Sequence, residues 1–306
     1  RPDRANMPEF QTDFDPAYGR LVLVAPDIGR VTANNPSAFT FAGTNSYVAG
    51  RTGCFVVDPG PDDDAHLDAL VAAIAGRPVE AILLTHTHRD HTGLVRRLAA
   101  LTGAPIVGGG PHRASRPLRD GEAHRLEAAG DTDLAFDRIL TDGEQLTLGG
   151  LPVSVVATPG HCANHLAFAV GEDGVFLSGD HVMGWSTSIV APPDGAMRDY
   201  MASLERLLTR DDRLYLPGHG GVIATPRPFV RGLIGHRRMR ESAIVRRLAD
   251  GDRTIPEIVA ALYKTVDVRL HGAAGLSVLA HLEDLVARGV VACDGPPTLA
   301  TTYTAA

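Results

Sequence analysis

Cysteine is scarce in this 306-residue sequence: Cys54, Cys162 and Cys293 are odd in number and widely spaced. They do not resemble the dense framework of a secreted disulfide protein, and they fit a reducing compartment. No apolar run approaches the ~18 residues that a membrane-spanning helix needs. The first ten residues lack the apolar segment of a signal peptide. We therefore expect a cytoplasmic protein without membrane association; what preceded Arg1 is left open.

Lysine is almost absent, since Lys264 is its one occurrence among 29 basic residues. The net charge of −7 and the pI near 6.0 disfavour a protein coated with nucleic acid. Two common catalytic motifs are also missing, the phosphate-binding Walker loop and the GxSxG nucleophile elbow. The apolar content of 44% and the charged content of 21% are ordinary for a globular protein. The length allows one large or two medium domains.

The densest chemistry lies at residues 81–93, which read AILLTHTHRDHTG. The opening apolar run predicts a buried strand, and a loop then presents His86, His88, Asp90 and His91. In an extended chain, residues two apart point the same way, so His86 and His88 can bind one cation together. Asp90 and His91 follow a turn and can face a second cation. Imidazole and carboxylate ligands suit zinc, with manganese and iron as lesser alternatives.

The sequence HTHRDH fits the HxHxDH signature of the metallo-β-lactamase superfamily, and the chain resembles the hydrolases of that family. The family's remaining ligands match, in order, His161 in TPGH, Asp180 in FLSGDH and His219 in LPGHG. The resemblance implies two ligand groups and one shared ligand. His86, His88 and His161 would hold the first metal; Asp90, His91 and His219 would hold the second. Asp180 would contact both.

The resemblance thus implies two zinc ions per chain. Two metals about 3.5–4 Å apart can share a hydroxide and clamp reacting oxygens. Coordination lowers the pKa of water from 15.7 to about 7, so that no serine or cysteine nucleophile is needed. Asp90 is the candidate catalytic residue, because it would orient the hydroxide and carry a proton. We expect metal-assisted hydrolysis of an ester, thioester, amide or related substrate. Zinc β-lactamases often carry cysteine at the position of Asp180, so antibiotic hydrolysis is not the natural expectation.

Three further residues are candidates for the substrate pocket. Asn45 belongs to a Gly-Thr-Asn segment that resembles the family's start-of-sheet segment beside the metals. His165 follows a ligand closely, and a role in supporting that ligand is as open as a structural one. Trp185 follows the GDH motif and could line the substrate mouth, although core packing is the favoured interpretation. Residues 110–135 carry several arginines and favour a solvated loop, with a flap over the pocket as the alternative.

The resemblance implies an α/β fold, the metallo-β-lactamase αββα sandwich, over residues 1–225. Within these residues, 1–20 are expected to form a loosely held arm. Apolar periodicity predicts helices at 63–75, 93–102 and 197–210. Strands are predicted at 21–26, from 45 onward, at 81–84, at 105–107, in several segments of 146–180, and directly before His219.

Composition changes near Thr225. Residues 226–306 begin with an Arg-rich helix at 227–247 that holds seven arginines. Two more helical patterns and a short β segment at 290–292 follow, an order that resembles a small winged-helix-like domain. The sandwich followed by this domain is similar to the β-lactamase-like protein 2 group within the superfamily.

Three functions compete at this level. A small-molecule hydrolase is the first, and a small-molecule substrate is the favoured partner. The resemblance to the β-lactamase-like protein 2 group implies the alternative of an endoribonuclease on single-stranded RNA, with the arginines of 227–247 tracking phosphates. The third is an iron-dependent thiol oxidoreductase, against which the sequence shows no flavin or rubredoxin-like segment. A homo-oligomer is left open.

Overall fold

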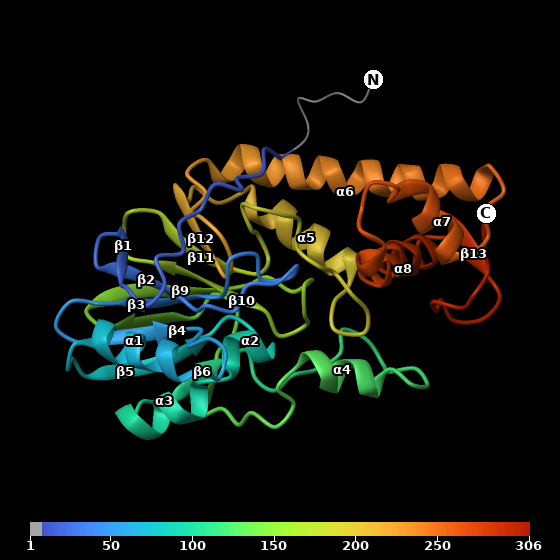
Figure 1. The fold of residues 1–306 in the computed structure, drawn as a ribbon. Coiled ribbons are helices and arrows are strands. Elements are labelled where there is room, and N and C mark those ends of the chain that lie inside the picture. Colours follow the sequence, from blue (N-terminus) through green and yellow to red (C-terminus); the bar gives the residue numbers. More distant parts are fainter. Residues whose placement is uncertain (1–7) are drawn as a thin grey trace.

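Two β-sheets lie face to face in the part of the chain that precedes α6, and helices cover their outer faces (Figure 1). The computed structural model describes residues 8–306. The first sheet has seven strands in the order of the sequence, antiparallel from β1 to β4 and parallel from β4 to β7. Its strands are β1 (Val22–Ala25), β2 (Ile28–Thr32), β3 (Asn45–Ala49), β4 (Cys54–Val57), β5 (Val79–Leu84), β6 (Ile106–Gly108) and β7 (Arg138–Ile139).

The second sheet has five strands in the order β12-β11-β10-β9-β8. Only the β11–β12 pair is parallel, and the other pairs are antiparallel. Its strands are β8 (Gln145–Leu148), β9 (Leu151–Ala157), β10 (Leu166–Val170), β11 (Val175–Gly179) and β12 (Leu214–Pro217).

Helices on both outer faces complete the four layers. The helices α1 (Asp64–Ile74) and α3 (Val95–Thr102) cover the first sheet. The helix α5 (Met197–Leu207) covers the second sheet, together with the first part of α6 (Pro226–Ala249). Two short helices, α2 (Arg89–Thr92) and α4 (Ala123–Ala129), occur in the loops after β5 and β6. This is the predicted αββα sandwich, a packing that buries both faces of each sheet.

The strand β4 shows how alternation builds the layers. Phe55 and Val57 point into the core between the two sheets. Cys54 and Val56 point the opposite way, into the core beneath α1 and α3. Successive side chains of a strand face opposite sides, so a strand covered on both sides is apolar at every position. This arrangement keeps the sheet rigid up to the strand ends, where the polar residues begin.

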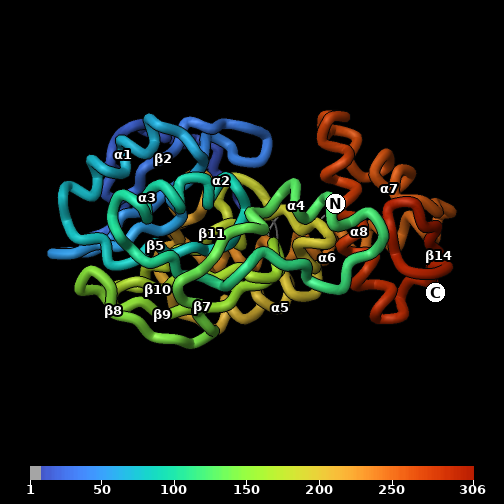
Figure 2. Tube along the Cα trace, turned by 90° about the horizontal axis from the view of Figure 1, so that it is seen from below, coloured from blue at the N-terminus to red at the C-terminus, as the bar shows by residue number. Residues whose placement is uncertain are grey.

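The C-terminal part packs around the second half of α6. It consists of α7 (Ile255–Leu262), the 3-10 turn η2 (Val268–Leu270), α8 (His271–Ala287) and the hairpin β13 (Val291–Cys293) with β14 (Tyr303–Ala305). Thr254 and Glu257 form a capping box at the start of α7. Figure 2 shows these elements at one end of the molecule, beside the sandwich.

Helix α6 belongs to two cores. Phe229 and Leu233 pack in the core above the second sheet, whereas Ile244 and Leu248 pack with α7 and α8. The helix therefore contacts both parts of the chain. A domain boundary between residues 225 and 226 stays a prediction.

The loosely held arm predicted over residues 1–20 falls partly outside the described residues, and the remainder is packed. Phe10 contacts Phe229 edge to face, with ring centroids 6.1 Å apart, and the Gln11 amide donates to the Gly184 carbonyl at 2.9 Å. The prediction of a loose arm is thus wrong for this part. The strand β2, the helix α4 and the strand β14 had no predicted counterpart. Among the described residues, no helix is long and apolar enough to cross a membrane.

Candidate metal centre

The seven predicted ligands lie close together at one edge of the sandwich. Each follows the end of a strand, where the buried apolar run stops. His86 and His88 follow β5, and α2 then carries Asp90 and His91. The other three ligands follow β9, β11 and β12, and they are His161, Asp180 and His219.

The first group consists of three imidazoles. His88 Nδ1 lies 2.9 Å from His161 Nε2. His86 lies beside both rings, with centroids 4.7 Å from His88 and 5.0 Å from His161. Its Nε2 is buried and has no hydrogen-bond partner among the described residues. One ligand atom from each ring falls within 4.8 Å of the others, the spacing at which three groups can hold one ion.

The second group consists of Asp90, His91 and His219. The Nε2 atoms of His91 and His219 are 3.3 Å apart. Asp90 Oδ2 lies 3.3 Å from His219 Nε2 and 3.5 Å from His91 Nε2. Ligand atoms of these three residues also lie within 4.8 Å of one another.

The carboxylate of Asp180 lies between the two groups. Its Oδ2 is 3.2 Å from His219 Nε2 and 3.7 Å from His161 Nε2. Its Oδ1 is 3.5 Å from His91 Nε2. One side chain thus reaches a member of each group, as the predicted shared ligand requires.

The opposite nitrogen of each ring is held by an oxygen. A carboxylate or carbonyl can only accept, so the imidazole nitrogen must carry the proton. Four such bonds occur: His88 Nε2 to Asp194 (2.9 Å), His91 Nδ1 to Asp58 (2.9 Å), His161 Nδ1 to the Ile189 carbonyl (2.6 Å) and His219 Nδ1 to the Gly43 carbonyl (3.1 Å).

The fifth ring, His86, is held through a hydroxyl. Thr85 donates its hydroxyl hydrogen to Asp58 at 2.6 Å, so the same oxygen accepts from His86 Nδ1 at 2.9 Å. In the neutral form of each ring, the lone pair therefore faces the centre. Five inward lone pairs and two carboxylates fit divalent metal ions, because a cation removes the repulsion between lone pairs that lie this close.

The pKa values show how strongly the charges depend on one another. Burial alone would raise the pKa of Asp90, but His91 and His219 hold it well below its ordinary value. Burial would lower the pKa of His219, but Asp180 and Asp90 raise it to about 9. Each carboxylate thus needs positive charge beside it, whether from a proton or from a cation.

Two carboxylates that support the ligands were not predicted. Asp58 bonds His91 and also accepts from the Thr85 amide at 2.8 Å. Asp194 accepts from His88 and, at 3.2 Å, from His112 Nε2. The signal for Asp58 was its position directly after β4, the same position that the ligands hold on their own strands. Asp194 follows no strand, so the sequence offered no such signal.

The three pocket candidates differ in their positions. Asn45 is fully buried and donates to the carbonyls of Pro217 and Gly220, so it fixes the loop that carries His219. His165 is also buried, and its Nε2 accepts from the backbone amide of Asp180 at 3.1 Å. The structure brings neither to the pocket lining.

Trp185 does line the pocket, where its ring stacks on Phe41 with centroids 4.9 Å apart. The pocket above the ligands has a volume of about 300 Å³. Its walls are largely apolar and include Ala38, Phe39, Met183, Trp185, Ile189 and Ala191. A small apolar substrate group fits such a cavity.

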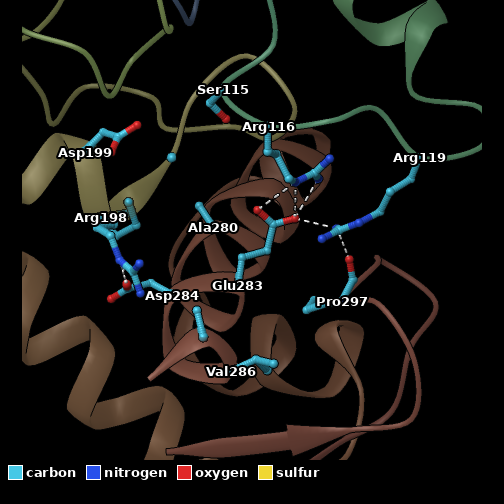
Figure 3. Close-up of a pocket in the computed structure, with 13 residues that line it drawn as sticks. Ser115, Arg116, Arg119, Arg198, Asp199, Ala280, Glu283, Asp284, Val286 and Pro297 are labelled. Carbon is cyan, nitrogen blue, oxygen red and sulfur yellow. Dashed lines mark hydrogen bonds and ion pairs between the residues drawn. The ribbon is translucent and has the colours of Figure 1, made fainter. Parts of the chain in front are cut away.

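Two arginines of residues 110–135 hold this stretch against the C-terminal part of the chain. Arg116 forms an ion pair of 2.6 Å with Glu122. Figure 3 shows that Arg116 and Arg119 also both reach Glu283, each at 2.6 Å. These pairs connect the loop to α8, in a cleft between the sandwich and the C-terminal part. Of the 110–135 stretch, only Ala129 lines the metal pocket.

Comparison with known families agrees with this geometry. Residues 39–219 match the family model of the metallo-beta-lactamase superfamily. The chain belongs to this superfamily. Residues 254–296 match the model of the beta-lactamase associated winged helix domain, which confirms the winged-helix-like part of the prediction.

Relatives cover most of the chain. The Beta-lactamase-like protein 2 homolog of Drosophila melanogaster is 31% identical, with 90% of this chain and 91% of the relative aligned. An Atrochrysone carboxyl ACP thioesterase of Aspergillus terreus is 27% identical, with 84% of this chain and 78% of the relative aligned. The metallo-beta-lactamase family protein TTHA1429 from Thermus thermophilus has a solved structure that matches with a TM-score of 0.76 at 26% identity, covering 93% of this chain and 100% of that one.

Proposed function

We propose that this superfamily member is a dinuclear zinc hydrolase that cleaves thioesters. The observation that carries the metal part is the orientation of the five imidazoles. Each is hydrogen-bonded on its outer nitrogen, so that in the neutral ring the lone pair of the other nitrogen faces the centre, and two carboxylates complete the set. The first metal would be held by His86, His88 and His161 and the second by Asp90, His91 and His219, with Asp180 shared. Nitrogen and oxygen donors of this kind suit zinc, and iron and manganese remain the alternatives.

Bound metal would supply Lewis acidity and bring the pKa of a water molecule near neutrality. The chain's own contribution begins with Asp90, whose carboxylate side chain is 30% exposed and lines the pocket. Its pKa is held well below the ordinary value by His91 and His219, so the group is ionised at neutral pH and can accept a hydrogen bond that orients the attacking water. The apolar walls exclude bulk water from the acyl group.

The thioester part is supported by the name of one relative. The A. terreus relative is named a thioesterase. Cys162, which lies beside a ligand in sequence, is fully buried, and burial raises the pKa of its thiol well above the ordinary value. A thiol in this state is a poor nucleophile or redox group. Cys162 is therefore not a candidate nucleophile, and the iron-dependent thiol oxidoreductase, which would act on a substrate thiol at the metals, stays an alternative.

A substrate panel tests the proposal. Zinc-loaded protein would be assayed on an acyl thioester, a nitrocefin-type lactam and a single-stranded RNA, with Asp90→Asn as the matched variant. We expect thiol release from the thioester only, and its loss in Asp90→Asn. Cleavage of the RNA alone would replace the thioesterase with the endoribonuclease. Cleavage of the thioester at the full rate by Asp90→Asn would contradict the role of Asp90.

A further inference from the structure

A second groove opens from the metal pocket toward the C-terminal part. The two cavities share five lining residues, Ala38, Phe39, Ser186, Thr187 and Ile189. The second one, which we call the side groove, has a volume of about 250 Å³. Its far wall comes from α6, α7, α8 and the segments that join them. A substrate bound at the metals can therefore extend into it without leaving the protein surface.

The side groove carries unbalanced positive charge. Arg237 and Arg240 of α6 line it, and no aspartate or glutamate among the described residues does. Across residues 8–306, no carboxylate lies within 4.0 Å of either guanidinium. Other arginines of the same helix behave differently: Arg238 pairs with Glu205 at 2.9 Å, and Arg247 pairs with Asp252 at 2.7 Å.

Arg237 is the more deeply placed of the two. It is only 4% exposed, lies over the Tyr200 ring at 5.1 Å and donates to the Ser188 carbonyl. Its Nε is buried and has no partner among the described residues. Removing a guanidinium from water without a counter-charge is unfavourable, so an anion arriving in the groove would stabilise it.

Arg240 lies nearer the surface of the side groove. Its guanidinium packs over the Tyr263 ring at 4.4 Å and donates one hydrogen bond, of 3.3 Å, to the Leu262 carbonyl. Its other donors remain available to a ligand. Burial lowers the pKa of the adjacent His236, and the positive charges of Arg237 and Arg240 lower it further, to about 4. The positive potential of the groove is therefore not cancelled by its surroundings.

We propose that the side groove binds the phosphate-bearing pantetheine arm of an acyl carrier whose thioester lies at the metals. Such an arm is a thiol carrier that combines methyl groups, amides and a terminal phosphate. Phe39 and Ile189 offer apolar contact, Ser186 and Thr187 offer hydroxyls, and the guanidiniums offer charge-assisted hydrogen bonds to phosphate. The inference rests on the proposed thioester hydrolysis and adds the identity of the leaving group.

Paired substrates test the groove. Zinc-loaded full-length protein would be assayed on an acyl 4′-phosphopantetheine thioester and on the same acyl pantetheine thioester without phosphate. We expect the wild type to favour the phosphorylated substrate by about 10-fold or more in kcat/KM, mainly through KM, as one charged hydrogen bond implies. Arg240→Met retains the apolar contact with Tyr263 and should bring the ratio close to one. Arg238→Met, on the same helix but outside the groove, should keep the wild-type ratio.

A binding measurement separates this inference from the hydrolase proposal. Calorimetry with S-methyl 4′-phosphopantetheine and S-methyl pantetheine requires no turnover. Tighter binding of the phosphorylated compound, lost in Arg240→Met, supports the side groove even if neither thioester is cleaved, in which case only the proposed function fails. Equal rates and equal affinities for the phosphorylated and the unphosphorylated compounds would overturn the inference, and the proposed thioester hydrolysis would stand. Binding of single-stranded RNA that Arg240→Met abolishes, without binding of the phosphopantetheine compound, also overturns it and assigns the groove to a polynucleotide.

Discussion

At the scale of single residues, the candidate centre depends on which ring nitrogen of each histidine faces inward. Asp58 and Asp194 set this for His91 and His88 by accepting a hydrogen bond on the outer side of each ring. Burial would raise the pKa of Asp194, but the hydrogen bonds from His112 and His88 outweigh it and lower the pKa to about 2. Asp194 is thus ionised, and a full negative charge orients His88.

Replacing Asp194 with alanine should therefore weaken metal binding without unfolding the chain. Loss of a carboxylate that orients a ligating histidine typically costs about 10–100-fold in metal affinity or activity. Competition with a chromophoric chelator measures the zinc affinity. Asp211→Ala is the matched control, since that side chain is fully exposed, and should bind zinc normally. Unchanged affinity in Asp194→Ala would show that His88 is oriented by other contacts.

Gly218 tests how closely the backbone approaches the ligands. A methyl group at this position would lie 2.2 Å from Asp180 Oδ1 and 2.8 Å from His91 Cε1. Gly218→Ala should displace both side chains and lower metal binding by at least about 10-fold, the scale on which misplaced ligands act. In Gly272→Ala the added methyl meets nothing within 4 Å, so zinc binding should remain at the wild-type level. Equal zinc content in the two variants would contradict the geometry of the centre.

At the scale of elements, the seven candidate ligands, which the structure brings together, could be picked out because each motif is local. HTHRDH, TPGH, GDH and PGHG all follow apolar runs that are recognisable without tertiary information. Asp58 and Asp194 were missed because their partners lie far away in sequence: Asp58 is 33 residues from His91, and Asp194 is 106 residues from His88. The burial of Asn45 was not foreseen for a related reason, since the two hydrogen bonds that it donates from its side chain span more than 170 residues. A position in or near a metal motif in the sequence does not reveal whether the side chain faces the cavity or the core.

The contact between the 110–135 loop and α8 makes a pH-dependent prediction. Hydrogen bonds from Arg116 outweigh partial desolvation and lower the pKa of Glu122 from 4.5 to about 2. A carboxyl whose folded pKa is depressed stabilises the fold above its unfolded pKa, and this stabilisation is lost as the pH falls toward the folded value. Glu122→Gln should therefore lower the free energy of unfolding at pH 7 by about 1 kcal/mol. The difference from wild type should shrink as the pH falls from 4.5 to about 2, the two pKa values of this carboxyl.

Urea denaturation at several pH values measures this difference. Glu205→Gln is the control, because its pair with Arg238 is more than half exposed on both sides and should contribute little. A Glu122→Gln difference that stays constant from neutral pH down to the folded pKa would mean that the ionised carboxylate does not stabilise the contact.

At the scale of the whole molecule, two parts recognisable from sequence meet along one helix. The αββα sandwich was predicted from the resemblance of its motifs to the superfamily, and the winged-helix domain from the order of its helical patterns and short β segment. The way in which the two parts pack against each other was not predicted, because it depends on α6 packing in two cores and on the ion pairs of Arg116. The side groove exists only through this relation, with its near wall from the sandwich and its far wall from the C-terminal helices.

The central claim is that seven residues hold two catalytic metal ions. The most direct test is the number of zinc ions bound per chain, determined by elemental analysis after reconstitution and dialysis, in wild type and Asp180→Ala, with thioester hydrolysis measured on the same samples. We predict about two zinc ions per wild-type chain. In Asp180→Ala we predict fewer ions, a loss of activity larger than the ~10–100-fold that loss of a supporting residue costs, and an unchanged circular dichroism spectrum. Full activity in Asp180→Ala, or in metal-free wild type, would contradict the account.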